Sequence, residues 1–295
     1  MQVSTPRVTL EVEDVGARDA PVVLLIMGLG MQLVAWPDAF VEALVGDGMR
    51  VVRFDNRDCG LSQAFDELRV PPIGWEMTRR MFGLPVRAPY PLEAMSDDAV
   101  ALLDALRIAR AHVCGVSMGG MIGQLMALDR PERVASLALA MTTSGARHLP
   151  PARPDAALAI LSRPRGRDLE SLVKHGVRLM RTIGSPAYPT PPEVLEARVR
   201  RAYERSVRPK GMLRQLLAVT AAPDRTPRLA RLTLPVHIVH GEADPLVPVE
   251  HGRQLARTLP AASAEFIAGM GHDLPDVAWQ ALRRAIARAA LGPDR

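Results

Sequence analysis

The feature that most constrains the fold is a series of short apolar segments of strand length, separated by segments with helical apolar spacing. Strands that are apolar throughout and alternate with helices are typical of a mainly parallel sheet covered on both faces. The sequence therefore predicts an α/β protein. The expected strands are Val8–Val12, Val22–Met27, Arg50–Phe54, His112–Val116, Val134–Met141, Val236–Val239 and Glu265–Ala268.

The alternation of strands and helices stops between about Ser144 and Pro235, in a stretch rich in proline and arginine. We expect residues 145–232 to form a helical cap (lid), inserted in a core made of residues 1–144 and 233–295. Within the cap, helical spacing is found at Leu169–Arg181, Glu193–Arg205 and Gly211–Ala218. In the core it is found at Trp36–Val45, Asp97–Leu106, Met118–Leu128 and Ala278–Ala290.

The charges are distributed unevenly between these two parts. Residues 145–232 hold 18 basic and 7 acidic side chains, a net charge of +11, whereas the rest of the chain holds 19 basic and 25 acidic ones, a net charge of −6. A basic layer of this kind attracts anionic substrates or nucleic acid. A solvated, arginine-rich helical face is the favoured explanation, because no nucleic-acid-binding motif accompanies the charge. We therefore expect no nucleic-acid partner.

Nothing in the sequence predicts a membrane segment or a metal centre. The longest apolar runs, Pro21–Ala35 and Val113–Leu128, are shorter than the ~20 residues that a bilayer requires. The segment Met1–Arg7 lacks the apolar region of a secretion signal. Two cysteines, Cys59 and Cys114, make neither a disulfide framework nor a metal cluster. We expect a cytoplasmic protein.

The pentapeptide Gly115-Val116-Ser117-Met118-Gly119 lies between a predicted strand and a predicted apolar helix. In this context it is typical of a nucleophile elbow, a turn so tight that the serine adopts a strained backbone conformation. The two glycines remove Cβ atoms that would collide with neighbouring backbone. The alternative is a glycine-rich turn without a reactive serine. We expect Ser117 to present its hydroxyl at the carboxyl edge of the sheet.

A serine hydroxyl needs a base near neutral pH, and a histidine oriented by a carboxylate supplies one. Of the seven histidines, His272 follows the last predicted strand in a loop between glycines and an acidic residue, where it is placed to reach Ser117. His240 ends the preceding strand and is the alternative. His112 begins the strand before Ser117, at the opposite edge of the sheet, and His237 is expected in the core.

The carboxylate that orients the base is predicted to be Asp244, in the turn after a predicted strand. The chain order Ser117, Asp244, His272 is the order used by enzymes with a nucleophile elbow. Glu242 competes for this role but is expected to be solvated. Asp273 adjoins His272, and side chains of sequence neighbours point in different directions.

Stabilising an oxyanion requires two backbone N–H donors. One is expected from Met118, next to the nucleophile. The other is expected from the turn Gly28-Leu29-Gly30, from Leu29 or alternatively from Gly28. This turn lacks the third glycine, and the acidic residue at the proper spacing, of a dinucleotide-binding site.

With these residues assembled, nearly the whole chain resembles the α/β-hydrolase family. Val22–Gly30 resembles its strand and oxyanion turn, with Met27-Gly28 where the family often has His-Gly. Phe54–Ser62 resembles its Asp-x-Arg-Gly-x-Gly-x-Ser stretch, with Asp58 in place of a common glycine, and Asp129–Val134 resembles its link to the next strand. The Met-Gly turn, Ala35-Trp36-Pro37 and the Asn-Arg-Asp form are most similar to the aclacinomycin methylesterase-like branch.

This resemblance implies an α/β-hydrolase fold and a serine carboxylic-ester hydrolase that needs neither metal nor organic cofactor. The expected substrate is a small to medium apolar ester, cleaved through an acyl-enzyme. The same triad also serves hydrolysis of amides, thioesters, lactones or carbon–carbon bonds, and cofactor-free perhydrolysis. A ligand receptor on this fold is a further alternative, because fold does not imply function. We expect a monomer or homodimer without a membrane partner.

Substrate preference is expected to come from apolar side chains of the cap and of a second irregular stretch, Gln63–Glu93, which is too apolar for an ordinary surface loop. Ordinary packing within these segments is the alternative for each candidate. The candidate pocket residues are Trp36, Trp75, Met81, Phe82, Met180, Ile183 and Tyr188.

Overall fold

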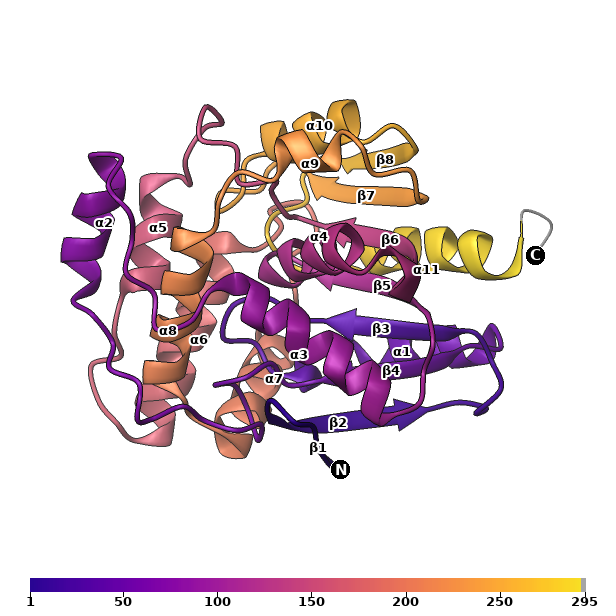
Figure 1. The fold of residues 1–295 in the computed structure, drawn as a ribbon. Coiled ribbons are helices and arrows are strands. Elements are labelled where there is room, and N and C mark those ends of the chain that lie inside the picture. The colour runs from indigo at the N-terminus through magenta and orange to yellow at the C-terminus, as the bar shows by residue number, and fades with distance from the viewer. Residues whose placement is uncertain (293–295) are drawn as a thin grey trace.

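The computed structural model describes residues 1–292 and contains an eight-stranded sheet (Figure 1). The strand order is β1-β2-β4-β3-β5-β6-β7-β8; β1, β2 and β4 pair antiparallel, and the remaining neighbours pair parallel. The last three residues of the predicted core segment 233–295 lie outside the described residues. The strands are β1 (Gln2–Ser4), β2 (Thr9–Val15), β3 (Val22–Ile26), β4 (Arg50–Phe54), β5 (Ala111–Val116), β6 (Val134–Ala140), β7 (Val236–Gly241) and β8 (Ala262–Ile267).

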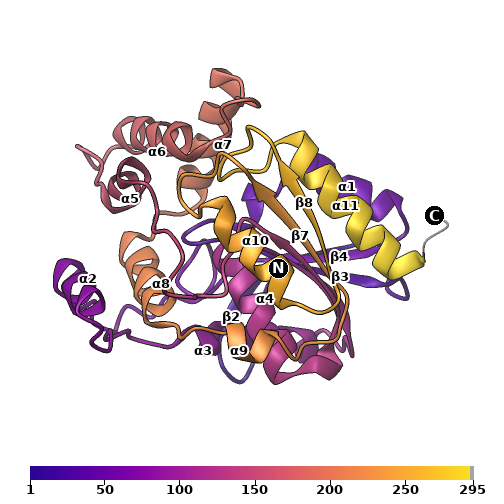
Figure 2. The same ribbon diagram turned by 90° about the horizontal axis from the view of Figure 1, so that it is seen from above.

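Helices cover both faces of this sheet (Figure 2), which confirms the predicted α/β class. Along β3, Val23 and Leu25 belong to one buried cluster, while Leu24 and Ile26 belong to the other, because successive side chains of a strand point to opposite faces. On the first face lie α1 (Asp38–Gly46) and α11 (Asp276–Leu291). On the second lie α3 (Leu92–Ala105), α4 (Met118–Asp129) and α10 (Val249–Thr258).

Several elements differ from the sequence predictions. Strand β1 was not expected, because its three residues, Gln2–Ser4, carry no apolar run. Helix α10 was also missed, since its sequence is mostly polar and only Val249 and Leu255 supply buried large apolar side chains. Helix α3 begins at Leu92, five residues before the predicted start at Asp97. The irregular stretch Gln63–Glu93 contains a further helix, α2 (Ile73–Met81).

The segment between β6 and β7 forms a helical insertion, here defined as residues 145–232. Figure 1 shows its helices α5 to α8 beyond the carboxyl ends of the parallel strands, with α2 beside them. The short helix at the end of the insertion, α9, instead packs beside α4 and α10. The bounds are α5 (Pro154–Leu161), α6 (Leu169–Ile183), α7 (Pro192–Arg205), α8 (Pro209–Ala221) and α9 (Thr226–Leu229); two 3₁₀ helices occur elsewhere, at Leu33–Ala35 and Pro131–Arg133.

Ion pairs between the helical insertion and the core account for part of the uneven charge distribution. Arginines of the insertion pair with aspartates that lie outside it, in a net acidic part of the chain. The positive charge of the insertion therefore has acidic partners within the same molecule. The pairs are Arg201 with Asp38, Arg205 with Asp55, Arg214 with Asp58 and Asp66, and Arg228 with Asp129.

Both cysteines are buried, and burial raises the pKa of the Cys59 and Cys114 thiols, which keeps them protonated. Among residues 1–292, no helix combines the length and apolar character needed to cross a bilayer. In the same part of the chain, no three side chains of His, Cys, Asp or Glu are grouped as metal ligands would be.

Candidate active site

Ser117 occupies a strained turn between β5 and α4. Its φ of 53° and ψ of −117° lie in a region that costs a residue with a side chain about 1–3 kcal/mol. The turn is tight because a Cβ on Gly119 would lie 2.0 Å from the carbonyl oxygen of Ile26. The Ser117 N–H donates to the Ala140 carbonyl at 2.9 Å, and Thr142 Oγ1 donates to the Ser117 carbonyl at 2.7 Å. These contacts use the backbone N–H and carbonyl of Ser117 to hold the turn, and they do not involve its hydroxyl.

The turn after β3 lies directly beside this serine. A Cβ on Gly28 would lie 3.3 Å from Ser117 Cβ and 3.9 Å from Ser117 Oγ. The Gly30 N–H donates to Gln215 Oε1 at 2.9 Å. Within residues 1–292, the N–H groups of Leu29 and Met118 have no such acceptor. Two backbone donors, one on the residue after Ser117 and one on the residue after Gly28, thus have no protein acceptor in this part of the chain.

His272 and Asp244, the base and acid expected from the sequence, are joined by a hydrogen bond. His272 Nδ1 donates to Asp244 Oδ2 at 2.7 Å, and the other oxygen, Oδ1, accepts the N–H groups of Leu246 and Val247 at 2.8 Å each. The two side chains are 7% and 0% exposed. With its proton on Nδ1, the ring presents Nε2 as a base.

The loop that carries His272 turns back from β8 across the end of β7. The Ala243 N–H donates to the Met270 carbonyl at 2.9 Å, and Met270 belongs to the same buried cluster as Val116, the residue before Ser117. The loop therefore returns toward the strand that precedes Ser117. In the described part of the chain, Ser117 Oγ forms no hydrogen bond.

The last residue of α6 and the linker that follows it hold the same loop from the other side. The His272 N–H donates to the Ile183 carbonyl at 2.7 Å, and the Gly271 N–H donates to Ser185 Oγ at 2.9 Å. Ser185 Oγ in turn donates to Asp273, whose carboxyl pKa is raised by burial. Asp273 is thus engaged by the insertion and does not compete with Asp244 for the imidazole.

His240, the alternative base, lies beneath the turn that carries Asp244. It is completely buried, its Nε2 donates to the Val247 carbonyl at 2.7 Å, and Nε2 is 3.7 Å from Asp244 Oδ2. A Cβ on Gly252 would lie 2.5 Å from its Nδ1, so no solvent or substrate reaches that nitrogen. Burial lowers the pKa of His240 and keeps the ring neutral. The geometry gives His240 a supporting position.

The seven candidate pocket residues lie in different parts of the structure and do not line one common pocket. Trp36 is 1% exposed and packs against Phe40 in the core layer of α1. Trp75, Met81 and Phe82, on or next to α2, are 59%, 77% and 72% exposed, so their side chains face solvent. Tyr188 is also exposed. Only Met180, which is half-buried, and Ile183, which is buried, belong to the helix that ends against the loop of His272.

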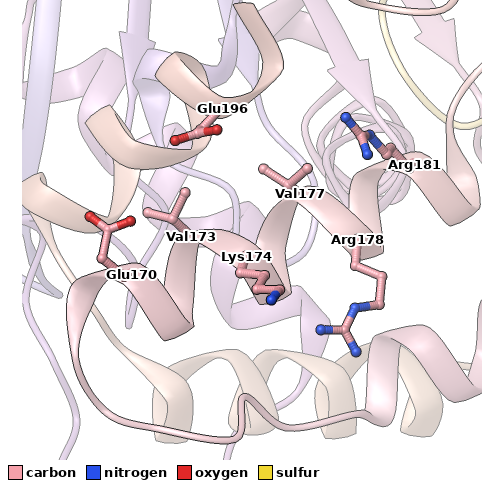
Figure 3. Close-up of a pocket in the computed structure, with 7 residues that line it drawn as sticks. All are labelled: Glu170, Val173, Lys174, Val177, Arg178, Arg181 and Glu196. Atoms are coloured by element: carbon pink, nitrogen blue, oxygen red, sulfur yellow. The ribbon is translucent and has the colours of Figure 1, made fainter. Parts of the chain in front are cut away.

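A cavity of about 480 Å³ lies between α6 and α7 (Figure 3), and none of the candidate catalytic residues lines it. Two valines on α6 point toward α7, and charged side chains of both signs surround them. It is thus a charged cavity within the helical insertion. Its lining residues are Glu170, Val173, Lys174, Val177, Arg178, Arg181 and Glu196.

One buried cluster near the site was not found by sequence reasoning. Asp58 accepts two hydrogen bonds from Arg214, at 2.7 and 2.8 Å, and one from Tyr90 Oη at 2.8 Å. Burial would raise the pKa of Asp58, but the bonds from Arg214, the Phe65 N–H and Tyr90 outweigh it and lower the pKa. The available signal was Asp58 itself, an aspartate where the family commonly has glycine, and its φ is 65°.

The class of this protein follows from its similarity to known proteins. The family description "alpha/beta hydrolase fold" matches residues 21–278, and the chain belongs to this family. It is 33% identical to rhodomycin D methylesterase DauP of Streptomyces sp. (strain C5) and to rhodomycin D methylesterase DnrP of Streptomyces peucetius. Each alignment covers 96% of this chain and 95% of the relative. These relatives confirm the resemblance to the methylesterase branch.

Solved structures give the same fold. A meta-cleavage product hydrolase from Pseudomonas fluorescens IP01 superposes with a TM-score of 0.75 at 18% identity, over 98% of this chain and 96% of that chain. At this identity the likeness concerns the fold alone.

Proposed function

We propose that this chain is a serine esterase in which Ser117, His272 and Asp244 act as a catalytic triad. The relationship to two methylesterases across nearly the whole chain makes it a carboxylic ester hydrolase. The observation that carries the triad is the 2.7 Å hydrogen bond between His272 and Asp244, at the same sheet edge as a serine held in a strained turn. Each group then has one chemical task.

In the proposed reaction, Ser117 Oγ attacks the ester carbonyl while His272 Nε2 accepts its proton. Asp244 holds the imidazole in the required tautomer and stabilises the imidazolium. His272 then protonates the leaving alcohol, and the acyl group stays on Ser117. A water molecule, deprotonated by His272, attacks the acyl-enzyme and releases the carboxylic acid.

The tetrahedral intermediates carry negative charge on the former carbonyl oxygen. We assign its stabilisation to the N–H groups of Met118 and Leu29, with Gly28 as the alternative to Leu29. Each donor contributes roughly 3 kcal/mol to the barrier reduction, as in other oxyanion holes. The proposal is supported by the close approach of Gly28 to Ser117 and by the absence of an acceptor for either N–H within residues 1–292.

The proposed substrate is a methyl ester of a small to medium apolar carboxylic acid, because both relatives are named as methylesterases. The helical insertion serves as its cap, and Met180 and Ile183 are the candidates for contact with the substrate. Support comes from the end of α6, where the Ile183 carbonyl accepts the His272 N–H. Amides, thioesters, lactones and carbon–carbon bonds stay alternative substrates for the same triad.

The decisive experiment is labelling of the purified protein with a fluorophosphonate, followed by assay on a panel of esters. We expect the label on Ser117 and hydrolysis of short methyl or p-nitrophenyl esters. Matched lactone, thioester and amide substrates separate the alternatives. A protein that is folded, unlabelled and inactive on every ester would overturn the proposal.

A further inference from the structure

A buried glutamine of the helical insertion joins the two core loops next to the nucleophile. Gln215 lies on α8 and is 0% exposed. Its Oε1 accepts the Gly30 N–H at 2.9 Å, and its Nε2 donates to the Arg57 carbonyl at 2.7 Å. One side-chain amide thus bridges the turn after β3 and the loop after β4. These segments lie 185 and 158 positions away from it in the chain.

Helix α8 is held against these loops tightly enough to fix that bridge. A Cβ on Gly211 would lie 2.0 Å from the Asp58 carbonyl oxygen, and a Cβ on Gly30 would lie 3.0 Å from Met212 Cγ. Arg214, the residue before Gln215 on α8, makes its two buried hydrogen bonds to Asp58. The amide of Gln215 therefore has little freedom to move away from the turn.

The bridge determines which N–H groups of the turn are available to a ligand. Three consecutive residues, Gly28, Leu29 and Gly30, could each aim an N–H at the region of Ser117. The Gly30 N–H is occupied by Gln215, and the Gly30 φ of 66° is compatible with that orientation. Within residues 1–292, the Leu29 N–H keeps no protein acceptor.

We infer that Gln215 is a positioning residue for the reaction: by binding the Gly30 N–H and the Arg57 carbonyl, it orients the turn so that the Leu29 N–H faces the developing oxyanion. This role rests on the proposed esterase function. The insertion then contributes directly to the electrostatics of the site, besides covering it. Because the oxyanion exists only in the transition state and the intermediates, the effect belongs to kcat and not to substrate binding.

The test replaces Gln215 with methionine, which is close to glutamine in length and shape but cannot make either hydrogen bond. The matched control is Gln254→Met. Gln254 is also buried and makes side-chain hydrogen bonds, to Ser144, Thr226 and Thr258, but it lies on α10. Both variants lose buried hydrogen bonds of a glutamine, so both report the cost of such a loss to folding.

Three quantities are measured for wild type and both variants: kcat and KM on p-nitrophenyl butyrate, the inhibition constant of an alkyl trifluoromethyl ketone, and the melting temperature. The serine hydroxyl adds to the carbonyl carbon of the ketone, and the carbonyl oxygen becomes a tetrahedral oxyanion. The affinity of the ketone therefore reports how well the site stabilises an oxyanion. For Gln215→Met we expect kcat to fall roughly 10- to 100-fold, with KM within about twofold of wild type. The inhibition constant of the ketone should rise by the same factor as kcat falls.

The outcomes separate the positioning role from the esterase function. The inference is supported if Gln215→Met loses kcat and ketone affinity as expected, while Gln254→Met melts at a lower temperature but keeps both. If both variants lose activity only in proportion to their loss of folded protein, or if Gln215→Met keeps wild-type kcat, the positioning role is wrong while the esterase function stands. A wild type without esterase activity or ketone inhibition overturns both.

Discussion

At the scale of single residues, the turn at Ser117 combines a strained backbone with close packing. Ser117 takes a backbone conformation that glycine would adopt at lower energy, and neighbouring glycines permit the close contacts of the turn. Its hydroxyl makes no hydrogen bond within residues 1–292. Removing that hydroxyl should therefore affect the chemistry and spare the fold.

Replacing Ser117 with alanine should lower kcat by at least ~10³-fold, because no acyl-enzyme can form. We expect the melting temperature to stay at or above the wild-type value, since no hydrogen bond of the side chain is lost. Steady-state kinetics and thermal unfolding measure the two effects. Substantial activity in the purified alanine variant would show that another group is the nucleophile.

His240 predicts a pH dependence of stability. Burial lowers its pKa from the ordinary value of 6.5, so the unfolded chain takes up the proton first as the pH falls. Proton uptake by the unfolded chain favours unfolding. The unfolding free energy is therefore unaffected by His240 above about pH 6.5 and decreases as the pH falls below this value. Asp244, His251 and His272 face this ring; Asp244 opposes the shift and the two histidines add to it.

His240→Gln keeps an Nε2 donor for the Val247 carbonyl but does not titrate. We expect the melting temperature of wild type to fall more between pH 8 and pH 5.5 than that of the variant. His148→Gln is the control, because His148 is exposed. Equal pH dependence in wild type and His240→Gln would contradict the assignment.

At the scale of elements, the end of α6 and the linker to α7 support the loop that carries His272. Ile183 and Ser185 contact residues 271–273 through three hydrogen bonds, and the Ala187 N–H donates to the Gly269 carbonyl at 3.1 Å. A loop held at this many points has few alternative conformations. The orientation of His272 thus depends on an element far from it in sequence.

Ser185→Ala removes the acceptor of the Gly271 N–H and the donor to Asp273. We expect kcat to fall by about tenfold, equivalent to about 1.4 kcal/mol in the barrier, because the His272 loop becomes less well positioned. KM should change little, and steady-state kinetics measure both constants.

The matched control for this prediction is Ser162→Ala, at an exposed position after α5 in the same helical insertion. Ser162 Oγ donates to the Ala159 carbonyl at 2.6 Å, so this variant also loses a serine hydrogen bond, but one within its own helix end. It should behave as wild type in the assay. Equal kinetics of the two serine variants would remove the linker between α6 and α7 from the mechanism.

At the scale of the whole molecule, buried and exposed ion pairs join the helical insertion to the core. The side chains of Arg214 and Asp58 are 1% and 0% exposed, whereas those of Arg201 and Asp38 are 55% and 52% exposed. Removing one partner of a buried pair leaves an uncompensated charge, while exposed pairs contribute little. The two pairs therefore differ sharply in their importance for docking the insertion.

Arg214→Met should lower the unfolding free energy by about 3–5 kcal/mol, because Asp58 stays buried without its partner. Arg201→Met should lower it by less than about 1 kcal/mol. Urea titrations of both variants measure the difference. Adding Asp58→Gly to Arg214→Met should recover much of the loss, since glycine suits the φ of 65° at this position. Equal destabilisation by the two arginine substitutions would contradict this account.

Most of the central architecture could be predicted because its signals are local. Apolar runs such as Val22–Met27 report burial on both faces, and the glycine spacing around Ser117 reports a tight turn. Elements with weaker apolar signals, β1 and α10, were missed because their stability comes from neighbours in space. The exposure of Trp75 and Phe82 could not be predicted either, because the hydrophobicity of a side chain does not determine whether other residues pack against it.

The sequence by itself determined the kind of sheet and indicated the tight turn at Ser117, and its chain order predicted that Asp244 orients His272. Only the tertiary structure decided how the helical insertion reaches that machinery: Gln215 at the turn after β3, Ser185 at the loop of His272, and Arg214 on Asp58. The physical reason is the range of each interaction. Periodicity and turn chemistry act between near neighbours in the chain, whereas a buried amide or ion pair is specified by partners that only folding brings together.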